Sequence, residues 1–192
     1  MRDMLKMILV LSLICGLSGL TLATVRQATR PRIEEQVMTY VQGPALRQIF
    51  PDCENNPVKD RKTFDASTGK VTVFPAMKGG KLEGVALETF GKGYGGPIGI
   101  MVGFSTDGDT LKGIGITTLK ETPGLGQRIT EPEFRDQFRG HTTREVALSK
   151  SGGDIAAVSG ATISSTGTVG AINDAIKIFQ QIKERLRTSW GS

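Results

Sequence analysis

The densest group of potentially reactive side chains lies in the segment SGATISSTGT, residues 159–168. It holds six hydroxyl residues and two glycines directly ahead of a predicted helix. The first turn of a helix offers unpaired N–H groups and positive partial charge, and glycines let a phosphate approach the backbone. The segment therefore predicts a phosphate site. The alternative is that one hydroxyl caps the helix while the others line a loop, which is the commoner role of such clusters.

Two glycine-rich turns lie upstream, GYGGP at residues 93–97 and ETPGLG at residues 121–126. They supply an aromatic ring (Tyr94), a carboxylate (Glu121) and a hydroxyl (Thr122). Neither turn has the G-x-G-x-x-G pattern of dinucleotide-binding proteins or the GK[ST] of a Walker loop. Taken alone, both turns predict tight-turn geometry and no particular ligand.

Cysteine and histidine are scarce, which excludes several kinds of site. Cys15 lies in an apolar segment and Cys53 lies far outside it, so we expect no disulfide between them. His141 is the only histidine, so a zinc, haem or iron–sulfur ligand set is not expected. A Ser-His-Asp hydrolase would need His141 with Ser159 or Ser164, and the G-x-S-x-G motif is missing. We therefore predict no catalytic residue and no metal site.

The size and charge of the chain limit the number of domains and the functions that it can have. Its 192 residues, 38% of them hydrophobic, suffice for one ordinary domain besides an apolar segment at the front. The 24 basic and 19 acidic residues give a net charge of +5, without a block of basic residues. Charge alone therefore gives no case for nucleic-acid binding.

The front segment is predicted to cross a membrane. Residues 7–25 contain no charged side chain over 19 positions, and a helix of that length spans about 28 Å, close to the hydrocarbon thickness of a bilayer. A cleaved signal peptide is the alternative, because Arg2 and Lys6 precede the segment, but the apolar part is long for one. We predict a retained anchor with residues 1–6 as a short tail. Basic residues on both sides leave its orientation open by the positive-inside rule.

The rest of the chain is predicted to form a juxtamembrane helix and loop over residues 26–65 and a domain over residues 66–192. Gly43–Pro44 should break the juxtamembrane helix before a second turn that ends near Phe50. Alternating apolar residues predict four mostly antiparallel strands, around residues 71–73, 85–87, 98–104 and 111–117. The turn Asp107–Gly108 predicts a hairpin between the last two.

Glycines inside the predicted strands need an explanation, because glycine weakens a strand unless something packs flat against the bare backbone. They are Gly99, Gly103, Gly113 and Gly115. Either a helix or a planar ligand ring could fill that role.

Two helices are predicted after the strands. Residues 132–139 form a short amphipathic helix with Phe134 and Phe138 one turn apart, and a long helix starts near Ser165 with an apolar stripe that packs on the sheet. The predicted fold is thus α+β, with a single N-terminal transmembrane helix followed by a mostly antiparallel sheet with packed helices.

The motifs SGATIS (159–164) and ETPGLG (121–126), together with one membrane anchor, resemble the FMN-binding domain family, whose members carry covalently attached flavin. Within it the chain is similar to the G subunits of Rnf-type electron-transport complexes. The C subunits of the sodium-pumping NADH:quinone oxidoreductase share both motifs but are usually longer. The pair of motifs, in this order, favours a phosphate site over a helix cap.

The resemblance implies that FMN is joined by a phosphoester to the sixth motif position, Ser164, where most members have threonine. Members also usually have aspartate three residues before the motif serine; here that position is Ala156, and the nearest acid is Asp154. The implied phosphate loop comprises Ser159, Gly160, Ala161, Thr162 and Ser165. The implied surroundings of the flavin ring are Glu121, Thr122, Gly124, Leu125, Tyr94 and Gly95.

The resemblance also implies a function. The chain would be an electron-relay subunit of a membrane-bound, ion-translocating ferredoxin:NAD oxidoreductase, without independent catalysis, and its partners would be the other subunits. A separate flavin transferase would attach FMN from FAD and release AMP. The domain would lie outside the cytoplasm, anchored in a bacterial inner membrane. The alternative function is a membrane-anchored scaffold that holds phosphate or a partner without redox chemistry.

Overall fold

The structure, a computed structural model, describes residues 1–190 apart from the side chain of Arg187. It divides into two compact units, Met1–Thr39 and the remainder from Tyr40.

The first unit is helix α1, Arg2–Val37, which contains the uncharged run and has no buried residue. Within residues 1–190 it belongs to the one helical stretch that is long and apolar enough to cross a membrane, with a mean hydropathy of 2.3. The hydroxyls of Thr21 and Thr24 donate to the carbonyls of Leu17 and Leu20 at 2.8 and 3.0 Å. These polar groups therefore need no water, as a hydrocarbon environment requires.

The chain continues through a π-helical turn, Met38–Gln42, into helix α2, Gly43–Ile49. We expected a helix break at Gly43–Pro44 followed by a second turn ending near Phe50, and α2, which starts at Gly43 and ends at Ile49, is that second helical segment. Pro44 stands in the first turn of α2, directly after the π-helical turn, so its missing N–H coincides with the irregular stretch of the helical backbone.

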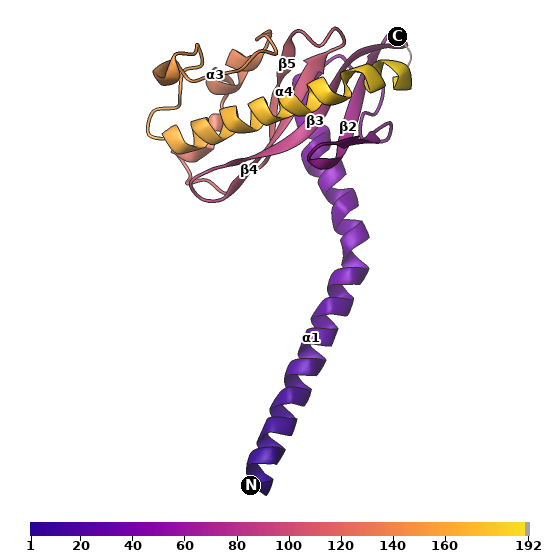
Figure 1. Ribbon diagram of the computed structural model, residues 1–192, viewed down its shortest axis with the longest axis vertical. Coiled ribbons are helices and arrows are strands. Elements are labelled where there is room, and N and C mark those ends of the chain that lie inside the picture. Colours follow the sequence, from indigo (N-terminus) through magenta and orange to yellow (C-terminus); the bar gives the residue numbers. More distant parts are fainter. Residues whose placement is uncertain (191–192) are drawn as a thin grey trace. The chain divides into compact units, whose positions relative to one another are not determined.

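The second unit contains a five-stranded antiparallel sheet in the order β1-β2-β3-β4-β5 (Figure 1). The strands are β1 Lys62–Ala66, β2 Gly69–Lys78, β3 Lys81–Lys92, β4 Pro97–Ser105 and β5 Leu111–Thr118. The four predicted strands are confirmed as β2 to β5. Strand β1 lies in the segment expected to be loop, because it is an edge strand with mostly exposed residues and carries no apolar alternation.

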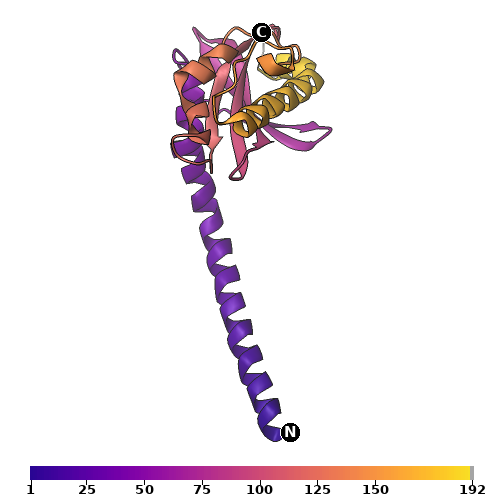
Figure 2. The ribbon, with the colours of Figure 1, turned by 90° about the vertical axis from the view of Figure 1, so that its left-hand side faces the viewer.

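Helix α4, Thr162–Trp190, covers one face of the sheet, and α2 packs on the other (Figures 1 and 2). On the α4 face the rings of Phe104 and Phe179 stack with centroids 4.2 Å apart. On the α2 face, a Cβ added at Gly103 would lie 2.2 Å from Ile49 Cγ2. A helix therefore packs against this bare strand, which decides between the two explanations of the strand glycines at this position.

Short helices complete the second unit: η2 Gly126–Thr130, α3 Pro132–Arg135, η3 Asp136–Phe138 and η4 Ser149–Ser151. The rings of Phe134 and Phe138 contact edge to face at 5.4 Å, as their predicted spacing indicated. The compact unit from Tyr40 onward includes α2 and β1 as well as the strands that were predicted.

Candidate cofactor site

Three loops that are distant in sequence meet at one buried carboxylate, that of Glu121, which is only 4% exposed. Its Oε1 atom accepts the N–H of Gly95 at 2.9 Å, and its Oε2 atom accepts the hydroxyl hydrogen of Ser164 at 2.5 Å. The ETPGLG turn thereby joins the GYGGP turn and the SGATIS segment. The three groups of residues that the sequence singled out separately form one site.

The glycines of these loops are needed for this close approach. A Cβ added at Gly93 would lie 2.3 Å from Glu121 Oε1, and one at Gly126 would lie 2.5 Å from Glu121 Oε2. At Gly95 it would lie 1.9 Å from the carbonyl oxygen of Lys120. Any side chain at these positions would displace the carboxylate or the backbone beside it.

Helix α4 begins at Thr162, three residues earlier than predicted, and Ser165 holds the loop in front of it. The Ser165 hydroxyl accepts the N–H of Val158 and donates to the carbonyl of Ala161, both at 3.0 Å. Gly160 adopts a φ of +79°, which allows the loop to turn into the helix. The free N–H groups of the first turn of α4 are therefore presented by a fixed loop.

The six hydroxyl residues of the segment fall into two sets. Ser164, Ser165 and Thr168 are buried, and each donates a hydrogen bond inside the protein. Ser159, Thr162 and Thr166 are exposed. The predicted attachment residue, Ser164, is 1% exposed and has its hydroxyl committed to Glu121. A phosphoester there would need the hydroxyl to leave its partner and would bring phosphate against a buried carboxylate.

A groove of about 730 Å³ lies along the amino-terminal part of α4. That volume is within the roughly 300–1,000 Å³ of small-molecule sites. Its lining comprises Phe90, Gly91, Lys92, Lys150, Thr162, Ile163, Thr166, Gly167, Gly170, Ala171 and Asp174. It combines apolar side chains, bare glycine backbone, two lysines and two exposed hydroxyls. These features suit a planar ring together with a phosphate.

Exposed apolar side chains concentrate at the same place. Among the described residues from Tyr40 onward, the exposed large hydrophobic residues are Tyr40, Phe90, Tyr94, Leu125 and Ile163. All except Tyr40 belong to the three loops or to the groove. An apolar patch on an otherwise polar surface indicates a binding site. A Cβ at Gly160 would lie 3.3 Å from Leu125 Cδ2, so this side chain lies close to the loop ahead of α4.

The residues expected around the flavin ring differ in accessibility. Thr122, Gly124, Leu125, Tyr94 and Gly95 are exposed, whereas Glu121 is buried beneath them. Exposed residues of both turns are available to a ring, while the Glu121 carboxylate is occupied by its two hydrogen bonds.

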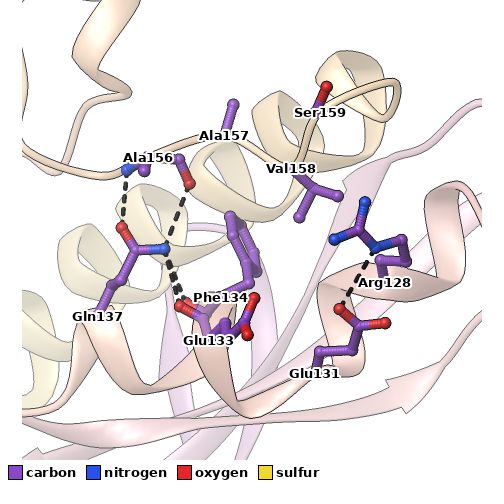
Figure 3. A pocket seen from close by; sticks show the side chains of 9 residues that line it. All are labelled: Arg128, Glu131, Glu133, Phe134, Gln137, Ala156, Ala157, Val158 and Ser159. Atoms are coloured by element: carbon purple, nitrogen blue, oxygen red, sulfur yellow. Dashed lines mark hydrogen bonds and ion pairs between the residues drawn. The ribbon is translucent and has the colours of Figure 1, made fainter.

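A smaller cavity of about 180 Å³ is lined by residues 156–159, which end at the motif serine, and by residues from η2 to η3 (Figure 3). Gln137 binds the backbone of Ala156, since its Oε1 accepts the Ala156 N–H at 2.7 Å and its Nε2 donates to the Ala156 carbonyl at 3.3 Å. Arg128 lies near Val158 and pairs with Glu131 at 3.3 Å. No motif in the sequence pointed to Gln137.

His141 takes no part in this site. Its Nε2 atom lies 3.0 Å from Asp154 Oδ1 and its Nδ1 atom lies 2.8 Å from the Thr142 carbonyl oxygen. The hydrogen bond from His141 lowers the pKa of the Asp154 carboxyl. Since Ser164 is bonded to Glu121 and His141 to Asp154, no Ser-His-Asp arrangement forms with Ser164.

Comparisons with known proteins agree with this geometry. Residues 93–177, which contain all three loops, match the FMN-binding domain family. The G subunit of an ion-translocating oxidoreductase complex from Cereibacter sphaeroides is 32% identical and aligns with 96% of this chain and 90% of its own length. The G subunit of a proton-translocating ferredoxin:NAD(+) oxidoreductase complex from Clostridium ljungdahlii is 29% identical, over 87% of this chain and 86% of its own.

Among solved structures, the crystal structure of Shewanella oneidensis NqrC superposes with a TM-score of 0.56 at 26% identity, covering 72% of this chain and 73% of that one. The structural comparison and the sequence comparisons thus indicate related proteins. The chain belongs to the family of G subunits of ion-translocating oxidoreductase complexes, with an FMN-binding domain that contains the site described above.

Proposed function

We propose that this chain is a membrane-anchored electron-relay subunit that carries FMN within a complex of the ferredoxin:NAD oxidoreductase class. Its partners are the other subunits of that complex, as for the Clostridium ljungdahlii relative. The observation that carries the proposal is the convergence of all three motif loops on Glu121 beside a groove of suitable size. A scaffold without a cofactor would not need this combination of apolar lining, exposed hydroxyls and phosphate-binding geometry.

The residues fit FMN in two parts. The first turn of α4 and the nearby Lys92 and Lys150 suit the phosphate, because free N–H groups and cations stabilise negative charge. Phe90 and Ile163 provide apolar surface for the ring. When bound, FMN accepts and donates electrons, while the protein fixes its position and its electrostatic surroundings.

We further propose that FMN is held by a phosphoester in this loop, and the geometry supports Thr162 over Ser164 as the acceptor. Thr162 is exposed, starts α4 and lines the groove, whereas Ser164 is buried and bonded to Glu121. A flavin transferase would form the bond between the Thr162 oxygen and the FMN phosphorus. In that step the pyrophosphate bond of FAD breaks, the hydroxyl proton is lost and AMP leaves.

Intact-mass measurement of the denatured full-length protein tests the proposal. We expect an added mass of FMN less one water, and fragmentation should place it on a peptide containing residues 159–168. Protein produced together with a flavin transferase is the required sample, and protein produced without one is the control. A colourless protein of unmodified mass from the first sample would favour the scaffold alternative.

The proposal includes an orientation: the domain lies on the extracytoplasmic side. Cys53 is partly exposed and lies outside α1, so it can report this. Burial raises the pKa of the Cys53 thiol, so labelling should be done in alkaline buffer. An impermeant thiol reagent should label cells with a permeabilised outer barrier and an intact inner membrane, and a Cys53→Ser protein should stay unlabelled. Labelling only after lysis would place the domain on the cytoplasmic side of the membrane.

A further inference from the structure

We propose that Glu121 is a positioning residue for the flavin: its carboxylate locks the GYGGP turn and the first turn of α4 together and places a negative charge next to the site. This inference rests on the proposed function, since it concerns how the same site holds and tunes FMN. It assigns Glu121 a role through Ser164 and Gly95, instead of direct contact with the ring.

The hydrogen bonds carry the positioning role. A carboxylate accepts hydrogen bonds only, and each Glu121 oxygen has a donor from a different loop, Gly95 N–H or Ser164 Oγ–H. Both Glu121 and Ser164 are almost wholly buried, so water does not readily replace a lost hydrogen bond of Glu121, and the loss would cost free energy. Ser164 lies two residues after Thr162 on the same helix turn, so its position fixes the presentation of the proposed attachment hydroxyl.

The surrounding backbone shows that the carboxylate is fixed in place. Gly93 and Gly126 both lie so close to its oxygens that a Cβ at either position would overlap them. A carboxylate in such a shell cannot swing toward solvent without moving two loops. Its charge is therefore held at one place beside the flavin, where it opposes the addition of electrons.

The test uses full-length protein carrying FMN, with the redox midpoint of the flavin as the main measurement. Glu121→Gln keeps the size of the side chain and removes its charge. We expect the equilibrium constant for flavin reduction to rise about tenfold, which is about 30 mV for a two-electron couple. Ser164→Ala removes one hydrogen-bond donor to Glu121 and should shift the flavin midpoint by less than Glu121→Gln does. Ser164→Thr keeps the hydroxyl and should have the wild-type midpoint.

A matched control is Glu88→Gln. Like Glu121, Glu88 is a carboxylate with two donors, the Gln42 amide at 2.8 Å and the Thr117 hydroxyl, but it is only partly buried and lies on the α2 face of the sheet. Its loss should lower the thermal stability of the protein and leave the flavin midpoint unchanged. The unfolding midpoint of the apoprotein, measured for every variant, separates loss of fold from a change at the site.

Three outcomes would overturn the inference. One is an unchanged midpoint in both Glu121→Gln and Ser164→Ala with FMN attached to both. Another is an equal shift in Glu88→Gln, which would indicate a general effect of charge. The third is additive effects in the Glu121→Gln/Ser164→Ala double variant, since partners in one hydrogen bond should couple. Wild-type protein that never acquires FMN would instead refute the proposed function itself.

Discussion

Helix α4 lies on one face of the sheet with 29 residues, and α2 lies on the other with 7. On the α2 face, side chains such as Ile49 fill the space above the strand glycine Gly103. On the α4 face, Gly91 of β3 and Gly167 of α4 bring backbone against backbone, since a Cβ at Gly91 would lie 1.9 Å from the Gly167 carbonyl oxygen. Beside that contact lies the groove.

The difference between the two faces shows that glycine can serve helix packing on one side and ligand binding on the other. Glycine at the α2 face lets a helix close over the strand. Glycine at the α4 face, including Gly170, together with the short side chain of Thr166, leaves room along the helix for a ligand. Glu88 on the α2 side and Glu121 at the site are both carboxylates with two donors, so they can be compared directly.

The largest expected effect concerns the hydroxyls at the start of α4. Thr162→Ala should abolish covalent flavin, measured as in-gel fluorescence of denatured protein and as loss of the FMN mass. Ser164→Ala and Thr166→Ala should remain labelled, because the first hydroxyl is buried and the second is not in the motif. Flavin that persists in Thr162→Ala and disappears in Ser164→Ala would restore the assignment made from the sequence.

The α4 face should carry much of the stability. Phe179→Ala removes a ring that is 2% exposed and stacked on Phe104, and it should cost about 3–5 kcal/mol. Denaturant unfolding of the full chain in detergent measures it. Phe90→Ala is the control, since that ring is 59% exposed and its loss should change the unfolding free energy by about 0.5 kcal/mol or less. Equal losses would mean that Phe90 is part of the core.

The α2 face should respond to added volume without affecting the flavin. Gly103→Ala puts a methyl group against Ile49 and Phe50, so α2 must shift, at a cost of about 1–3 kcal/mol. The flavin midpoint should stay at its wild-type value. In the matched exchange on α4, Gly170→Ala meets nothing within 4 Å and should stabilise the helix by about 0.5–1 kcal/mol. A flavin shift in Gly103→Ala would show that the two faces are coupled.

The smallest expected effect is a pH dependence at the β4–β5 turn, beneath the carboxyl-terminal half of α4. The N–H of Asp109 and the Ser105 hydroxyl lower the pKa of the Asp107 carboxyl. A lowered pKa in the folded state stabilises the protein above the unfolded value of 3.8, and this stability is lost as the pH falls through the folded value. The side chain is exposed, so the effect should stay below about 1 kcal/mol.

Asp107→Asn tests this, because the amide oxygen can still accept both hydrogen bonds but the group no longer titrates. Unfolding free energies from about pH 2 to pH 6 should vary less steeply for the variant than for wild-type protein. Parallel curves for the two proteins would contradict the assignment. A steeper curve for the variant would mean that the carboxylate is destabilising where it stands.

Much of the fold could be predicted from periodicity. Alternation in β4 places Ile98, Ile100, Val102 and Phe104 in the core that α4 covers, although β4 is buried on both faces. The long apolar stripe of α4 packs into the same core, and such patterns are local. Strand β1 was missed because it is an edge strand with few buried side chains. The start of α4 was placed too late because the hydroxyl residues of its first turn resemble loop and cap residues as well as helix.

The sequence by itself determined the membrane helix, the antiparallel sheet with its covering helix, and the three loops that contribute to the site. These follow from composition and spacing along the chain. Only the tertiary structure decided that the loops meet at Glu121, that Ser164 faces inward while Thr162 faces the groove, and that α2 packs on Gly103. Burial and pairing between distant segments depend on how the elements pack, and neighbouring hydroxyls of one motif carry no local sign of which side they will face.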